Sequence, residues 1–298
     1  MSIPVDTQAN AAMEIAAGAR RGYWSEVGRR LLRDPVAVVC GVLLALLLGS
    51  ALLAPWLGLQ DPFATSMINR LKPIGTPGHI LGTDELGRDM LSRLVHGGRY
   101  TLMLGLLPVV FAFAIGTMLG VFAGYVGGIV NTVIMRVIDI FFAFPSVLLA
   151  IAISGALGAG ILNMLVSLTV VFIPQITRVA EGVTTSVRAL PYVDAARISG
   201  ASPLTVVRVH VLGNVLSPIF VYATSLTSLA MILAAGLSFL GLGVRPPEAE
   251  WGLMLNTLRT ALYIDPLIAA LPGAMIFFTS LCLNLLSDGL RSAMNVKD

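Results

Sequence analysis

The sequence predicts an all-α membrane protein with six transmembrane helices. Hydrophobic residues make up 56% of the 298 residues and charged residues 12%, which is about half the charged share of an average soluble domain. Apolar segments of roughly 20 residues, the length that a helix needs to cross a bilayer, recur along the chain. The six predicted spans are Val36–Ala54, Thr101–Ala123, Val137–Leu157, Ile161–Ala180, Val215–Ala235 and Leu267–Leu286.

The first 35 residues form the expected cytoplasmic N-terminal segment. They are polar, carry several arginines, and are too long and too charged for a simple cleaved signal. With this segment inside, 12 of the 19 lysine and arginine residues lie on the inner flanks of the spans, as the positive-inside rule requires. Both termini are therefore predicted to be cytoplasmic. The basic residues flank the spans instead of forming one patch, which argues against nucleic-acid binding.

Residues 36–99 are predicted to contain the first span and an outer loop with an interfacial helix. Thr83 is placed to cap a helix with an acidic first turn, and apolar residues follow at helical spacing until Gly97-Gly98. Such an amphipathic helix is expected to lie on the membrane surface. In the outer loop after the fifth span, Trp251 is expected at the level of the lipid headgroups.

Residues 100–298 are predicted to form the core, with five spans and a cytoplasmic loop at 184–213. In the second span, Gly116, Gly120 and Gly124 are spaced four apart and share one helix face. Small residues on one face allow another transmembrane helix to approach closely. We expect this stripe to pack against a helix and favour packing over a role in gating.

The most informative stretch is Tyr192 to Pro218, which is polar and helix-forming between two spans. Gly200 follows a run of good helix formers and is suited to the left-handed conformation that ends a helix. Ser202 is placed to cap a second helix, and Pro203 fits its first position. The stretch therefore predicts a helix, a sharp turn and a second helix on the cytoplasmic side.

No enzyme chemistry is indicated by the sequence. The only lysines, Lys72 and Lys297, do not follow glycine, so the chain lacks the lysine that a P-loop uses to bind ATP phosphates. The three histidines lie in separate segments without metal-binding spacing. Cys40 and Cys282 lie in separate apolar segments and are interpreted as packed residues, so no metal site is predicted.

A stand-alone ion-coupled secondary transporter is the main alternative, and a membrane scaffold without transport is a third class. An ion-coupled carrier is expected to hold ionisable groups near the middle of its spans. Here the candidate groups lie near predicted cytoplasmic ends and three residues apart, which favours local neutralising pairs. These pairs are Arg136 with Asp139, Arg178 with Glu181, and Asp288 with Arg291.

Several motifs resemble bacterial ABC-importer permeases. Asp194-Ala195-Ala196, followed by Gly200 and His210-Val211-Leu212-Gly213, is similar to the EAA loop of these permeases. From about Pro35 to the end, the chain resembles the C-type, second transmembrane subunit of the dipeptide/oligopeptide/nickel permeases. The motifs of this wider resemblance are Leu81-Gly82-Thr83-Asp84, Gly87-Arg88-Asp89, Met135-Arg136 with Asp139, Ala143-Phe144-Pro145, Leu237 to Gly243, Pro246-Pro247, Glu250-Trp251-Gly252 and Asp288 to Arg291.

The resemblance implies a type I importer fold and a set of partners. These are a B-type permease subunit that forms a heterodimer with this chain, two ATP-binding subunits that carry ATP and Mg, and a periplasmic or extracellular solute-binding protein. No cofactor is expected in this chain. The glycine stripe at Gly116, Gly120 and Gly124 is assigned to packing with the partner permease subunit. The residues expected to contact the ATPase are Asp194, Ala195, Ala196, Arg197, Gly200, Ala201 and Ser202.

The chain departs from the family pattern at three positions. Asp194 stands where the family usually has Glu, His210 where it has Ile, and Gly213 where it commonly has Pro before Asn214. Glycine at this last position is expected to loosen the start of the fifth span. The sequence thus predicts a permease subunit of an ATP-driven importer in the bacterial inner membrane. Peptides are the first expected substrate, with nickel complexes and related solutes as competitors.

Overall fold

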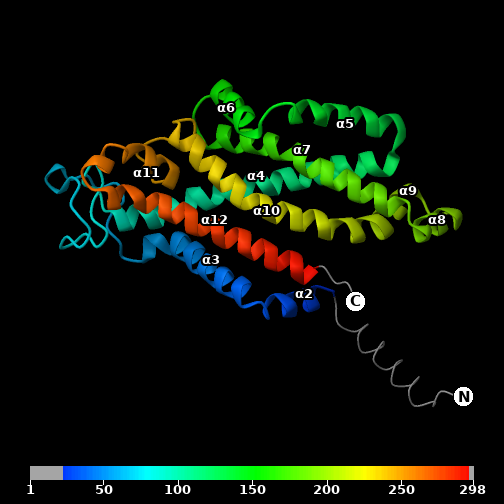
Figure 1. Cartoon of the computed structure of the whole chain (residues 1–298), viewed down its shortest axis with the longest axis horizontal. Coiled ribbons are helices and arrows are strands. Elements are labelled where there is room, and N and C mark those ends of the chain that lie inside the picture. The colour runs from blue at the N-terminus through cyan, green and yellow to red at the C-terminus, as the bar shows by residue number, and fades with distance from the viewer. Residues whose placement is uncertain (1–22, 295–298) are drawn as a thin grey trace, which may run out of the picture.

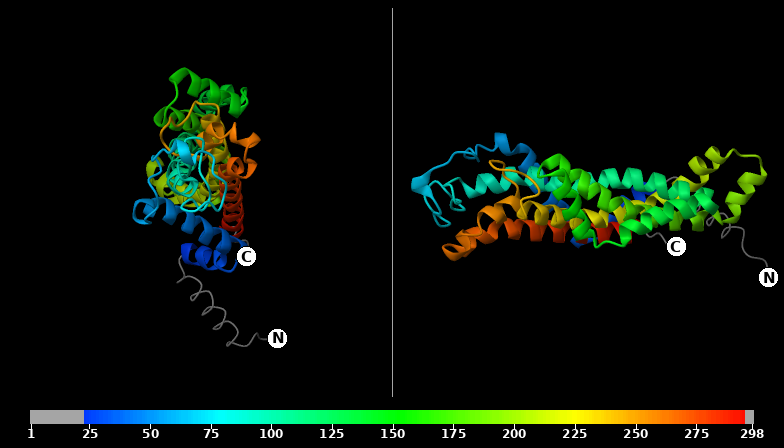
Figure 2. Two further views of the ribbon diagram at one scale, coloured as in Figure 1. Left: turned by 90° about the vertical axis from the view of Figure 1, so that its left-hand side faces the viewer. Right: turned by 90° about the horizontal axis from the view of Figure 1, so that it is seen from above.

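The computed structural model describes residues 23–294, which form an elongated bundle of helices (Figure 1). Four long helices run along the bundle, α8 and α9 lie at one end, and α11 lies with the long loops at the other (Figure 2). The α-helices are α2 (Tyr23–Leu31), α3 (Pro35–Leu53), α4 (Met90–Val126), α5 (Gly128–Phe142), α6 (Ser146–Leu157), α7 (Ile161–Arg188), α8 (Pro191–Ile198), α9 (Pro203–Thr205), α10 (Leu212–Phe239), α11 (Trp251–Thr257) and α12 (Pro266–Met294).

Within residues 23–294, five helices are long and apolar enough to span a membrane, and a sixth crossing arises if the bent pair of α5 and α6 is counted as one span. The prediction of one continuous helix over Val137–Leu157 is wrong, because α5 and α6 meet at 87°. Pro145 stands at this break with extended backbone. Proline has no N–H to donate to a helical hydrogen bond, and it disfavours the helical conformation of the residue before it. The helix therefore ends here.

The second span begins earlier than the sequence predicted and includes the expected interfacial helix. Thr83 does not cap a helix; its hydroxyl accepts from the Lys72 amide at 2.8 Å within the preceding loop. Asp89 is the actual N-cap, and its carboxylate accepts from the Ser92 amide at 2.8 Å. Gly97-Gly98 does not end the helix either, because α4 continues to Val126.

The glycine stripe of α4 packs inside this chain and not against the partner subunit, so that part of the prediction is wrong. A Cβ atom at Gly120 would lie 2.5 Å from the Ala180 Cβ, and one at Gly116 would lie 3.0 Å from the Ile173 carbonyl oxygen. At Gly124 the nearest atom would be the Glu181 carbonyl oxygen, at 2.7 Å. All of these neighbours belong to α7. The stripe therefore lets α4 and α7 pack with their backbones close together.

At the end opposite α8, the loops are held by buried polar groups. Arg93 forms an ion pair with Asp84 at 3.1 Å, and its guanidinium donates to the Pro62 carbonyl oxygen at 3.1 Å. Trp251 is only 1% exposed, and its Nε1–H donates to the Leu94 carbonyl oxygen at 2.8 Å. The predicted place for Trp251 at the lipid headgroups is therefore wrong, because the side chain is enclosed between α4 and α11.

Two of the predicted local ion pairs are replaced by contacts between helices. Arg178 of α7 pairs with Asp139 of α5, and its guanidinium lies over the Phe142 ring with 4.5 Å to the centroid. Glu181 accepts from the Asn131 amide group at 2.6 Å, again linking α7 to α5. These charges tie α5 to α7 instead of neutralising their own helix neighbours. Sequence spacing identified the residues but not their partners.

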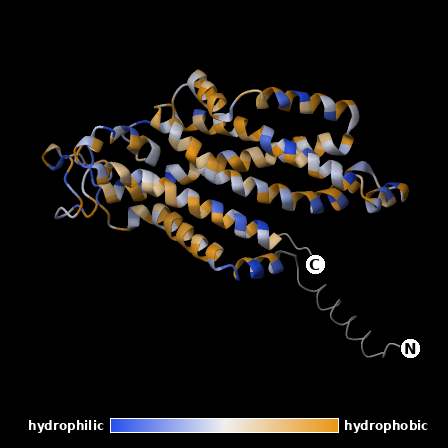
Figure 3. Ribbon diagram, in the orientation of Figure 1, coloured by the Kyte–Doolittle hydropathy of each residue, from blue (hydrophilic) through white to orange (hydrophobic). Residues whose placement is uncertain are grey.

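The N-terminal helices pack along α12. Asp34 caps α3 by accepting from the amide of Val36 at 3.0 Å, and Gly289 of α12 allows close contact with Ala37. Cys40 of α3 and Cys282 of α12 are free thiols on the two helices that pack here. Hydrophobic residues predominate along α3, while hydrophilic residues gather on α2 and in parts of the loops opposite α8 (Figure 3). The expected role of residues 1–22 lies outside the described residues.

Candidate coupling site

The loop between α7 and α10 protrudes at one end of the bundle (Figures 1 and 2). Pro191 occupies the start of α8, where its missing N–H costs no helical hydrogen bond. Val193 is fully buried and belongs to the main apolar core. On the outward side of the same helix, Ala195 is exposed and Ile198 has 87% of its surface exposed. One face of α8 is therefore fixed to the bundle while the other is free.

The turn after α8 has the geometry that the sequence predicted. Gly200 has φ +85°, and its N–H donates to the Arg197 carbonyl oxygen at 3.0 Å. The next amide, of Ala201, donates to the Ala196 carbonyl oxygen at 3.2 Å. These two bonds form a Schellman motif, which satisfies the last free carbonyls of the helix and requires a left-handed residue at the glycine position. The turn at Gly200 is confirmed.

The second helix begins as predicted at Ser202-Pro203. The Ser202 hydroxyl accepts from the Thr205 amide at 3.3 Å, and Pro203 is the first helical residue. The chain then continues as a π-helical segment, Val206–Val211, which leads into α10. The sequence did not predict this segment. π-Helical turns are rare and are frequently found at functional sites.

A small polar network links α8 to the start of α10. The Asn214 side-chain amide donates to the Tyr192 hydroxyl at 2.9 Å and to the His210 carbonyl oxygen at 2.8 Å. The Tyr192 hydroxyl also donates to that carbonyl oxygen, at 3.4 Å. The π-helical geometry frees backbone carbonyls from regular pairing, and side chains such as these then bind them. The network joins the protruding helix directly to a membrane-spanning helix.

The charged residues of the site are arranged along α8. Asp194 forms an ion pair with Arg197 at 3.3 Å, one helical turn apart, yet 59% of the Asp194 side chain remains exposed. The Arg197 guanidinium also lies over the Tyr125 ring, 5.3 Å from its centroid, and so connects α8 to the end of α4. The Asp194 carboxylate has free acceptor positions for a basic partner group.

The predicted site residues do not all lie on the free face. Ala195 and Ser202 are exposed, whereas Ala196 and Ala201 are half-buried and pack against the main core. Gly213 lies within the first turn of α10, with no atom within 4 Å of a Cβ built there. The backbone at Gly213 is helical, so the structure does not require glycine. Within residues 23–294, no three His, Cys, Asp or Glu side chains are grouped as metal ligands.

The fold and this protruding loop define a class of protein, the membrane components of binding-protein-dependent transport systems. Residues 116–296 match the family "Binding-protein-dependent transport system inner membrane component", and residues 22–73 match the "N-terminal TM domain of oligopeptide transport permease C". The chain belongs to this family and is a permease component of ABC importers. This membership favours the partner-driven permease over the stand-alone ion-coupled carrier.

Similar proteins agree with this assignment along nearly the whole chain. A "Glutathione transport system permease protein GsiD" of Pectobacterium atrosepticum is 41% identical over 277 residues, which cover 93% of this chain and 92% of the relative. The protein of the same name from Escherichia coli is 39% identical with similar coverage. Among solved structures, an inward-facing MetNI methionine ABC transporter matches with a TM-score of 0.56 and 21% identity, covering 68% of this chain and 97% of that chain. This last likeness concerns the fold alone.

Proposed function

We propose that this chain forms half of the translocation pathway of an ATP-driven importer and couples to ATPase subunits through residues 192–209. The observation that supports this most directly is the two-sided geometry of α8. Val193 anchors its back in the core, while Ile198 presents an exposed apolar side chain at the end of the helix. An exposed large apolar residue beside a free carboxylate at Asp194 suits insertion into a groove with a basic rim.

The coupling path would run from α8 into the membrane through two connections. The Tyr192 and Asn214 side chains link α8 to α10, and Arg197 links it to Tyr125 at the end of α4. A displacement of α8 by a partner would therefore act on both spans at once. Packed cores and hydrogen-bond networks transmit such displacements because they resist gradual deformation.

The proposed assembly contains a B-type permease subunit, two ATP-binding subunits and a solute-binding protein. ATP and Mg would be bound and hydrolysed by the ATP-binding subunits. Because α8 would then face the cytoplasm, both termini of this chain would also be cytoplasmic, in a bacterial inner membrane. Family membership supports this arrangement, and so does the excess of basic residues predicted for the inner flanks.

Peptides are the proposed substrates, and glutathione is the first to test because two relatives are named as glutathione transport permeases. The test uses the complete set of subunits in liposomes, with labelled glutathione, a dipeptide and a nickel complex outside. We expect saturable, ATP-dependent uptake of at least one peptide. Uptake of the nickel complex alone would contradict the peptide assignment and leave the coupling proposal intact.

An Ala195→Arg variant tests the coupling site. A bulky charge on the free face of α8 should weaken ATPase docking by about 2 kcal/mol, or roughly 30-fold in affinity, with matching loss of uptake. Ser292→Arg is the matched control, since Ser292 is exposed on α12 at the same end of the molecule. If Ala195→Arg assembles and imports at the wild-type rate while its control does the same, α8 is not the coupling element.

A further inference from the structure

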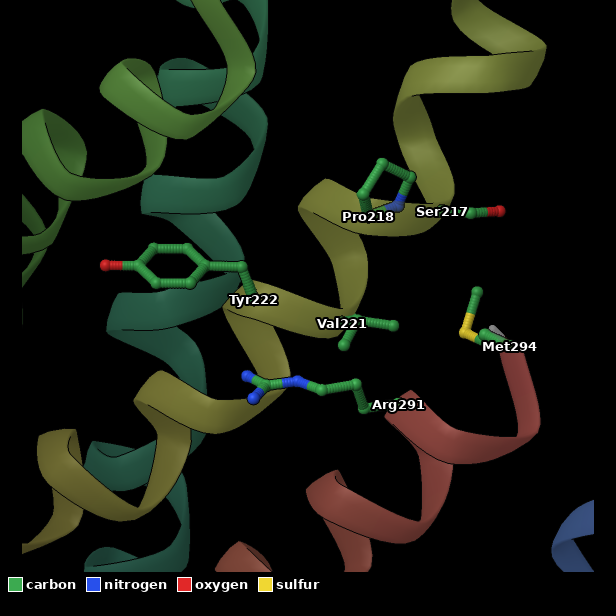
Figure 4. A pocket seen from close by; sticks show the side chains of 6 residues that line it. All are labelled: Ser217, Pro218, Val221, Tyr222, Arg291 and Met294. Atoms are coloured by element: carbon green, nitrogen blue, oxygen red, sulfur yellow. The ribbon is translucent and has the colours of Figure 1, made fainter. Parts of the chain in front are cut away.

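A cavity of about 380 Å³ lies between α10 and α12, toward the C-terminal end of α12. Its walls combine two hydroxyl groups, one cationic side chain and three apolar side chains. Figure 4 shows the Arg291 side chain extending from α12 toward α10, on the same side of α10 as Tyr222. The six lining residues are Ser217, Pro218, Val221, Tyr222, Arg291 and Met294.

Arg291 is the cationic group of this cavity. Its side chain is exposed, and within residues 23–294 no ion pair or hydrogen bond engages its guanidinium. Asp288, one turn earlier on α12, is exposed as well and forms no ion pair with Arg291 in this part of the chain. A guanidinium has five N–H donors in a planar fork that fits phosphate oxygens in pairs.

The position of Arg291 along α12 fits the surface of a membrane. The 29 residues of α12 give a length of about 43 Å, longer than the ~30 Å hydrocarbon layer. Arg291 lies 11 residues beyond the helix midpoint, or about 16 Å along the helix axis. With that midpoint at the middle of the bilayer, Arg291 lies just past the ~15 Å half-thickness of the hydrocarbon layer. A cation at this depth reaches lipid headgroups, and Val221 of α10 lies at about the same level (Figure 4).

α2 packs beside the cavity. Val27 of α2 packs with Val221 and Met294 in one apolar cluster. The same helix carries Arg29 and Arg30 in its last turn, and both pair with Glu26, so α2 adds a single net positive charge at this end of the bundle. Basic pockets between transmembrane helices on the cytoplasmic side are suited to anionic lipid headgroups.

We propose that this cavity binds an anionic phospholipid of the inner leaflet. The Arg291 guanidinium holds the phosphate, and an acyl chain lies against Val221. The inference rests on the membrane orientation given under the proposed function. The lipid fills the space between two spanning helices, one of which continues directly from the coupling segment.

The test is retention of phosphatidylglycerol by the purified complete complex, measured by native mass spectrometry. Wild-type complex is expected to retain phosphatidylglycerol in preference to phosphatidylcholine. Arg291→Gln should weaken this binding about fivefold, because one arginine near an anionic surface contributes about 1 kcal/mol. Arg291→Lys should keep most of the binding. Arg136→Gln, an exposed arginine on α5, is the matched control and should change nothing.

Three outcomes would overturn the inference. The first is equal retention of phosphatidylglycerol by wild type and Arg291→Gln, and the second is full displacement by inorganic phosphate, which would indicate a soluble anion. The third is a cross-link from Arg291→Cys to a partner chain, which would indicate a protein carboxylate. Retention of phosphatidylglycerol is measured by mass and does not depend on whether the complex transports a solute. A complex that imports nothing still reports on the lipid, and normal import without bound lipid contradicts only this inference.

Discussion

Replacing Gly120 with alanine tests whether the glycine stripe of α4 holds the chain together internally. The new Cβ would lie 2.5 Å from both the Ala180 Cβ and the Thr177 carbonyl oxygen, and 2.8 Å from the Glu181 nitrogen. Carbon atoms pack best at about 3.5–4.0 Å, so α4 and α7 would have to separate by roughly 1 Å. Overpacking of this kind costs about 1–3 kcal/mol, and the better helix propensity of alanine offsets up to about 1 kcal/mol of it.

The assay is resistance of the isolated chain in detergent micelles to unfolding by heat and by sodium dodecyl sulfate. Gly120→Ala should unfold more easily than wild type by about 1–2 kcal/mol. The matched control is Gly182→Ala on α7, where no atom lies within 4 Å of the added Cβ, and it should be neutral or slightly stabilising. A Gly120→Ala chain that is as stable as wild type alone, but fails to bind its partner permease, would refute the intrachain packing and restore the interface interpretation.

Three further changes test the loops at the two ends. Gly200→Pro should abolish uptake and transport-stimulated ATPase activity in a chain that still inserts, because proline fixes φ near −65° and removes the N–H that binds the Arg197 carbonyl oxygen. Normal uptake would contradict this. Tyr192→Phe removes a bridge worth about 0.5–1.5 kcal/mol, so amides 206–214 should exchange hydrogen faster, and unchanged exchange would exclude the linking role. Burial raises the pKa of Glu250 above its ordinary value of 4.5, so folding favours its protonated form. Stability should fall as pH rises from 4.5 toward the raised pKa, and Glu250→Gln should flatten this dependence in thermal unfolding.

Much of the site was predictable because its determinants are local. The Schellman turn needs a residue with positive φ at one position, and Gly200 provides it. The helix start at Ser202-Pro203 likewise depends on a hydroxyl and a proline within three residues of each other. Signals of this kind act between neighbours in the chain, so they can be interpreted before the fold is known. The π-helical segment had no such signal, and the hydrogen bond from Asn214 to Tyr192 beside it joins residues 22 positions apart.

The sequence by itself determined the membrane class, most of the spans and the helical hairpin outside them. Hydrophobic length and capping residues fix these features wherever the helices are placed. Only the tertiary structure decided that Gly120 faces α7 of the same chain, that Arg178 pairs with Asp139, and that Trp251 is buried. Each of these depends on which helix lies opposite. A helix face shows what it is able to contact, but its neighbour is chosen by the packing of the whole chain.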